Sequence, residues 1–218
     1  MRSVARTLGW LSAVSLLLTA CYGAYQIKPD DPRSVSGLTP NVEDKDAGLV
    51  AVSPDFDLKA YRVIAVSPFP VTDPGIKDDG DRRLAESMSG FLQTELVRRL
   101  RESALFERVI NLSETPMPAG GPSALRLDGD IPRLGEGSQA ARYFAGAFGA
   151  GRTRAQMETR FVDVTTGKVV MLTADRRVAS VGFFGGDSKD HLRESFDDAA
   201  RDLARFLIRL SRGEAPRP

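Results

Sequence analysis

The sequence is poor in the residues that most often carry chemistry. Its 218 residues contain one cysteine and one histidine. A single cysteine excludes a disulfide within the chain, and one histidine with no available thiol leaves carboxylates as the main metal ligands. We therefore expect no metal site and no cofactor, and we expect an apolar core to supply the stability of the fold.

An excess of charge and a second long apolar run are also missing. The chain has 30 Lys and Arg against 29 Asp and Glu, a formal net charge of +1. This balance gives no electrostatic reason to expect a nucleic acid as partner. After the first twenty residues, no apolar run reaches the roughly 20 residues that a membrane-spanning helix needs. The content of 42% apolar and 27% charged residues is typical of a globular domain.

The N-terminus has the pattern of an export signal. Arg2 and Arg6 precede an uncharged, mostly apolar run that ends in Leu18-Thr19-Ala20-Cys21. A basic start, a short apolar run and a small residue before the cut are typical of a secretory signal peptide. With a cysteine at the end, the pattern resembles a bacterial lipobox. It predicts cleavage between Ala20 and Cys21 and removal of residues 1–20.

Cys21 is then the predicted lipidation site, with a diacylglycerol on its sulfur and usually a third, amide-linked acyl chain. Each buried methylene contributes about 0.8 kcal/mol, so several chains make a firm membrane anchor. Tyr22 follows Cys21. Aspartate at that position is the usual inner-membrane retention signal in Gram-negative cells, so Tyr22 favours the outer membrane, with the domain in the periplasm.

Composition divides the mature chain into three parts. Residues 21–60 are rich in Pro, Gly, Asp and Ser without a sustained period, which predicts a lipidated N-terminus and flexible tether. Within it, Leu49–Val52 is a candidate edge strand. Residues 61–212 carry the periodic patterns of an ordered domain, and residues 213–218 are predicted to be a disordered tail.

The ordered part predicts an α+β fold. A β-branched run at 62–66 predicts a buried strand, and a leucine stripe from Leu84 to Leu100 predicts a long amphipathic helix. Residues 105–110 suit a short strand, and alternation predicts three more strands at 124–134, 152–161 and 168–178. A second amphipathic helix begins near Asp187 or Ser188. The expected order is βαββββα, a small, mostly antiparallel sheet with both helices on one face.

Several motifs in this order resemble a known family. The motifs are Val63-Ile64-Ala65-Val66-Ser67-Pro68-Phe69, Leu105-Phe106-Glu107-Arg108-Val109, Leu127-Asp128-Gly129-Asp130-Ile131, residues 146–151 with Arg142 ahead, and Phe161-Val162-Asp163-Val164-Thr165-Thr166-Gly167. Over residues 60–210 they resemble the bacterial lipoproteins catalogued as domain of unknown function 4410. The layout is more distantly similar to curli-secretion lipoproteins and to lipoprotein activators of cell-wall synthases. The resemblance implies a lipid-anchored periplasmic domain and assigns no activity.

The polar residues that could carry chemistry have simpler interpretations. His191 is expected at the surface, off the apolar stripe of the last helix. Asp78, Asp79 and Asp81 precede the first long helix, where acidic residues favour the helix dipole, and their spacing does not match an EF-hand calcium loop. The glycines of residues 146–151 lack the strand, helix and Lys-Ser/Thr context of a nucleotide-binding loop.

Two carboxylates and one aromatic set stay open as candidate sites. Asp128 and Asp130 share a strand face near Arg126, where a carboxylate pair could act in acid–base chemistry or line the solvated side of a half-buried sheet. The candidate contact patch for other proteins combines two glycine-rich stretches, with the residues Tyr143, Phe144, Phe148, Phe183 and Phe184.

The sequence therefore favours a non-enzymatic, lipid-anchored envelope lipoprotein that acts as a periplasmic binding or assembly module. Its expected partners are the membrane, through Cys21, and envelope proteins, with no nucleotide or nucleic acid. One alternative is a subunit of an outer-membrane secretion channel, against which stands the charge along one whole face of strand 152–160. The other is an envelope hydrolase that uses Asp128 or Asp130.

Overall fold

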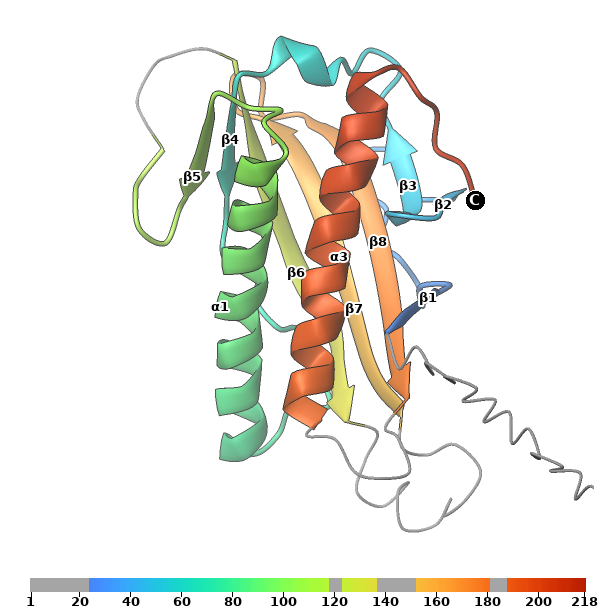
Figure 1. Cartoon of the computed structure of the whole chain (residues 1–218), viewed down its shortest axis with the longest axis vertical. Coiled ribbons are helices and arrows are strands. Elements are labelled where there is room, and N and C mark those ends of the chain that lie inside the picture. Colours follow the sequence, from blue (N-terminus) through green and yellow to red (C-terminus); the bar gives the residue numbers. More distant parts are fainter. Residues whose placement is uncertain (1–23, 118–122, 137–151, 181–187) are drawn as a thin grey trace, which may run out of the picture.

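The computed structural model describes residues 24–117, 123–136, 152–180 and 188–218. The predicted α+β class is confirmed, because α1 and α3 lie side by side on one face of a mostly antiparallel sheet (Figure 1). In chain order the elements are β1 Tyr25–Ile27, β2 Val42–Asp44, β3 Gly48–Val52, the 3-10 helix η1 Leu58–Ala60, β4 Val63–Val66, α1 Asp79–Glu102, β5 Arg108–Asn111, β6 Ala124–Glu136, β7 Arg152–Asp163, β8 Val169–Ser180 and α3 Ser188–Ser211. No helix in these described ranges is long and apolar enough to span a bilayer.

The strands of the described chain form one sheet. Their order is β2-β3-β8-β7-β6-β4-β5, and β1 pairs with β8 beside β3. β4 is parallel to β5 and β6, while the other pairs are antiparallel. α1 supplies the long connection that two parallel strands require. From β4 onward the order of elements is the predicted βαββββα.

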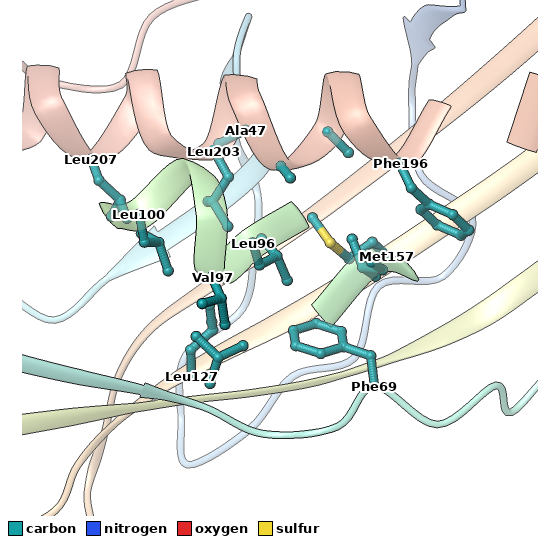
Figure 2. Packing of buried hydrophobic residues seen from close by; sticks show 14 of the residues in the cluster. Ala47, Phe69, Leu96, Val97, Leu100, Leu127, Met157, Phe196, Leu203 and Leu207 are labelled. Atoms are coloured by element: carbon teal, nitrogen blue, oxygen red, sulfur yellow. The ribbon is translucent and has the colours of Figure 1, made fainter. Parts of the chain in front are cut away.

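The helix-covered face of the sheet carries the apolar core. Leu127 and Phe161 lie opposite each other on β6 and β7, and both are fully buried. Because side chains alternate across a strand, every second residue of these strands meets the helices. Figure 2 shows Leu127 and Met157 of the sheet gathered with Leu96 of α1 and Leu203 of α3, all members of one buried cluster.

The helix stripe and its start agree with the sequence. The leucine stripe of α1 is buried from Met88 to Leu100. Asp78 is the N-cap of α1, and its side chain accepts a hydrogen bond from the Asp81 backbone N–H at 2.8 Å. This bond satisfies one of the donors that every helix start leaves unpaired. The acidic loop before α1 therefore caps a helix.

Two of the family motifs meet at Gly129. A Cβ at this position would lie 2.2 Å from Cε1 of Phe69 and 2.4 Å from the carbonyl oxygen of Glu158. No side chain fits at such distances, so glycine lets Phe69 pack directly on the backbone of β6. Phe69 is fully buried and is labelled in Figure 2. The glycine of the Leu127–Ile131 motif is thus explained by the phenylalanine of the first motif.

The N-terminal segment differs from the predicted tether from Ala24 onward. β1 and β3 both pair with β8, and β2 adds to β3. The predicted edge strand at Leu49–Val52 is present and begins at Gly48. Composition gave no sign of the rest, because β1 and β2 are only three residues long and carry no periodic pattern. They are held by pairing with a long strand that is distant in sequence.

The C-terminal tail also differs from the prediction of disorder. The Lys45 backbone N–H donates to the Arg217 carbonyl, and the Arg217 N–H donates to the Asp44 carboxylate at 3.0 Å. Nη2 of Arg209 in α3 donates to both carboxylate oxygens of Asp44, at 2.7 and 2.8 Å, and Arg209 also contacts Asp46. All three side chains are almost entirely buried. The β2–β3 turn therefore joins the last helix and the tail.

Candidate functional site on the strapped face of the sheet

The second face of the sheet is polar and is crossed by residues 28–40, which we call the strap. The residues that alternate with the core on β6 and β7 point to this side, among them Asp128, Asp130 and Glu158. The strap contains a narrow hairpin in which Val35 and Leu38 exchange both backbone hydrogen bonds at 3.0 Å. Gly37 at the turn has φ +82°, a conformation that favours glycine.

Arg33 is the main contact between strap and sheet. Its guanidinium pairs with both Asp130 and Glu158, with 3.0 Å from Nε to Oε2 of Glu158. Asp130 and Glu158 are direct neighbours across β6 and β7. Their side chains are 7% and 10% exposed, whereas that of Arg33 is 51% exposed. Two nearly buried carboxylates thus share one half-exposed cation from a distant part of the chain.

Gln156 provides a second contact with the strap. Its side-chain amide accepts from the Asp30 backbone N–H at 2.9 Å and donates to the Asp30 carbonyl at 2.8 Å. The same amide donates to Glu158 at 3.0 Å. Next to it, Arg176 of β8 forms an ion pair with the Asp30 carboxylate. The strap is therefore held by polar contacts along its first half.

The two carboxylates singled out in the sequence have separate partners. Asp128 accepts two hydrogen bonds from the Arg126 guanidinium at 2.8 Å and one from the Ser67 hydroxyl at 2.6 Å. Partial burial acts to raise the pKa of Asp128, but the hydrogen bonds from Arg126 and Ser67 and the charges of Arg126 and Arg160 outweigh it and lower the pKa. Asp128 is therefore ionised at neutral pH, which suits an ion pair and not a general acid.

Asp130 is enclosed, in contrast to the solvated position that its strand pattern predicts. It accepts from the Thr72 hydroxyl at 2.6 Å and pairs with Arg33. The cavity left between the strap and this part of the sheet is about 10 Å³, lined by Arg33, Val35 and Glu158 among others. A cavity of this size holds about one water molecule. The arrangement around Asp130 thus offers no room for a substrate.

The other predicted sites have these positions. Cys21 and the aromatic patch, with Tyr143, Phe144, Phe148, Phe183 and Phe184, lie outside the described residues. The described residues that border the two aromatic stretches, Glu136, Arg152 and Ser180, are neighbours at one end of the sheet. In the described ranges, no group of three or more His, Cys, Asp or Glu is placed to hold a metal ion.

His191 differs from its predicted position at the open surface. Its side chain is only 17% exposed, and its Nδ1 lies 3.8 Å from Glu194 one helical turn away. The backbone carbonyl of His191 accepts a hydrogen bond from the Ser195 hydroxyl at 2.8 Å. These contacts place His191 within one helical turn of Glu194 and Ser195.

Sequence reasoning missed Arg33 as a partner of the sheet. The alternation of β7 marked Glu158 as polar, but nothing local indicated which cation would neutralise it. Arg33 lies 97 positions before Asp130 and 125 before Glu158. Acidic residues on two neighbouring predicted strands are a weak signal that a distant cation is needed, because buried charges are seldom left unpaired.

Comparisons with known proteins place the chain in a family. No curated protein matches it. The PelC dodecamer from Paraburkholderia phytofirmans is similar to 71% of this chain over 94% of its own length, with 10% identity and a TM-score of 0.44. A DUF330 protein from Xanthomonas campestris is similar over 72% of this chain and 86% of its own, with 11% identity and a TM-score of 0.43. The sequence pattern of one family matches residues 56–182, more than half of the chain, and the protein therefore belongs to the family described as a domain of unknown function, DUF4410.

Proposed function

We propose that this protein is a lipid-anchored envelope lipoprotein whose domain works in the periplasm as a non-enzymatic binding or assembly module at the outer membrane. The observation that carries the proposal is the N-terminal pattern that ends in Leu18-Thr19-Ala20-Cys21. Membership of a family without an assigned activity is compatible with it. The ion pairs around Asp128 and Asp130 support a structural role for the carboxylates.

Lipidation is tested with the full chain expressed in a Gram-negative host that is fed a palmitate analogue. The wild-type protein should be labelled and should sediment with the outer membrane. Cys21→Ala should carry no label, because the thioether cannot form. Tyr22→Asp is the matched control, since it should keep the label and move to the inner membrane. An unlabelled wild type, or a labelled Cys21→Ala variant, would contradict the anchor.

The binding role is tested separately by crosslinking in intact cells. We expect the wild-type protein to give reproducible crosslinks to envelope proteins, and Asp128→Asn combined with Asp130→Asn to leave the set of partners unchanged. Repeated absence of any envelope partner would count against a binding or assembly module. If the double variant folded normally but cells that carry it differed in phenotype from cells with the wild-type protein, the result would support the hydrolase alternative.

A further inference from the structure

The chain between the predicted anchor and the sheet is very short. Tyr25, the first residue of β1, follows Cys21 by four positions. Four residues span at most about 14 Å even when fully extended. The start of β1 must therefore lie close to the lipid surface, whatever conformation those four residues adopt. This is the opposite of the long tether that the composition of residues 21–60 predicts.

The register of β1 determines which end of the domain lies next to the lipid anchor. Tyr25 pairs with Val178, and Val178 pairs with Arg154 on its other side. This row lies near the end of β8 and the start of β7. The opposite end of the same strands is the turn at Lys168, where the Asp163 N–H donates to the Lys168 carbonyl. Arg154 and Asp163 lie nine positions apart on β7, about 30 Å at 3.3 Å per residue.

We infer that the end of the sheet marked by Tyr25 and Arg154 rests on the phospholipid surface, and that the Lys168 turn points away from it. This inference rests on the proposed lipidation of Cys21. Tyr25 is 44% exposed, although it is a large hydrophobic residue, and Arg154 is exposed as well. Tyrosine and arginine are favoured at the lipid headgroup level, where an aromatic ring and a cation both find partners.

The neighbouring edge of the domain is less suited to a lipid surface. Along β1, the strap, β2 and the turn after it, the exposed cations Lys28, Arg33 and Lys45 are matched in number by the exposed anions Asp30, Asp31 and Glu43. These charges cancel, so this edge has no net attraction for phosphate headgroups. The charges therefore favour an upright domain over one that lies on its β1 edge.

The orientation is tested with the complete lipidated protein in vesicles of phosphatidylethanolamine and phosphatidylglycerol. Because the Cys21 sulfur is consumed by lipid, Arg154→Cys and Lys168→Cys each introduce one free thiol for a fluorescent label. The two variants are matched, since each removes one exposed cation. With nitroxide-headgroup lipids as quencher, the label at position 154 should be quenched at least twofold more strongly than the label at position 168.

A spacer tests whether the short connection between Cys21 and β1 causes the difference in quenching. Twenty Gly and Ser residues inserted between Gly23 and Ala24 have a root-mean-square span of roughly 25 Å, and the quenching ratio should then fall toward one. Equal quenching at the two positions without the spacer would overturn the orientation. If the spacer left the quenching ratio unchanged, the short connection between Cys21 and β1 would not be the cause of the orientation. Flotation with the vesicles reports lipidation in the same samples, so failure of the anchor is seen separately, as protein that does not float.

Discussion

The two faces of the sheet are covered by different means. On one face, α1 and α3 bury apolar side chains such as Leu127 and Phe161. On the other face, a single strap is held by Arg33 and by the hydrogen bonds of Gln156. Apolar burial needs only the right period and volume, whereas the strap needs particular partners at particular positions. The helix-covered face should therefore dominate global stability, and the strapped face should control a local opening.

The largest effect is expected on the helix-covered face. Leu127→Ala should lower the free energy of unfolding by about 3 kcal/mol, because removal of this fully buried side chain leaves a cavity between β6 and the helices. Urea denaturation followed by circular dichroism measures this change. The conservative Leu127→Met variant serves as control and should lose less than about 1.5 kcal/mol. Equal losses in both variants would show that volume at this position is unimportant.

A smaller effect is expected on the strapped face. Arg33→Ala should lower the free energy of unfolding by about 2 kcal/mol. This is less than the roughly 3–5 kcal/mol lost when a fully buried ion pair is broken, because Arg33 is half exposed. Hydrogen exchange should rise in residues 28–40 before it rises in β6 or β7. The comparison is Glu107→Gln, which breaks the exposed Arg62–Glu107 pair and should have no measurable effect. If exchange rose equally throughout the sheet, the strap would not be a separate unit.

The smallest expected effect is a difference between the two faces in how the free energy of unfolding depends on pH. The pKa of Asp128 is lowered in the folded state, so its stabilisation is present above the unfolded value of about 3.9 and is lost as the pH falls through the folded value. Asp128→Asn should therefore flatten the fall in unfolding free energy below pH 4. Leu127→Ala should shift the whole curve and leave its slope unchanged. An unaltered slope in Asp128→Asn would show that the Arg126 pair does not stabilise the fold.

Much of the domain could be predicted because its signals are local. The stripe of α1, its Asp78 cap and the alternation of β6 and β7 each repeat within a few residues. The helices, the long strands and the α+β class follow from such patterns. The positions of β1, β2 and the strap could not be predicted, because their contacts join residues far apart in the chain. Arg33 and Gln26 show no local pattern, yet they reach Glu158 and Asp175 across most of the sequence.

The sequence by itself determined the apolar core, the order of the elements after Arg62, and the pattern that predicts lipid on Cys21. These depend on periodicity and on short motifs, which are written in consecutive residues. Only the tertiary structure decided that residues 24–60 belong to the sheet and that Asp130 is enclosed by Arg33. The reason is that a buried charge needs one partner of opposite sign, and the fold alone brings that partner within reach.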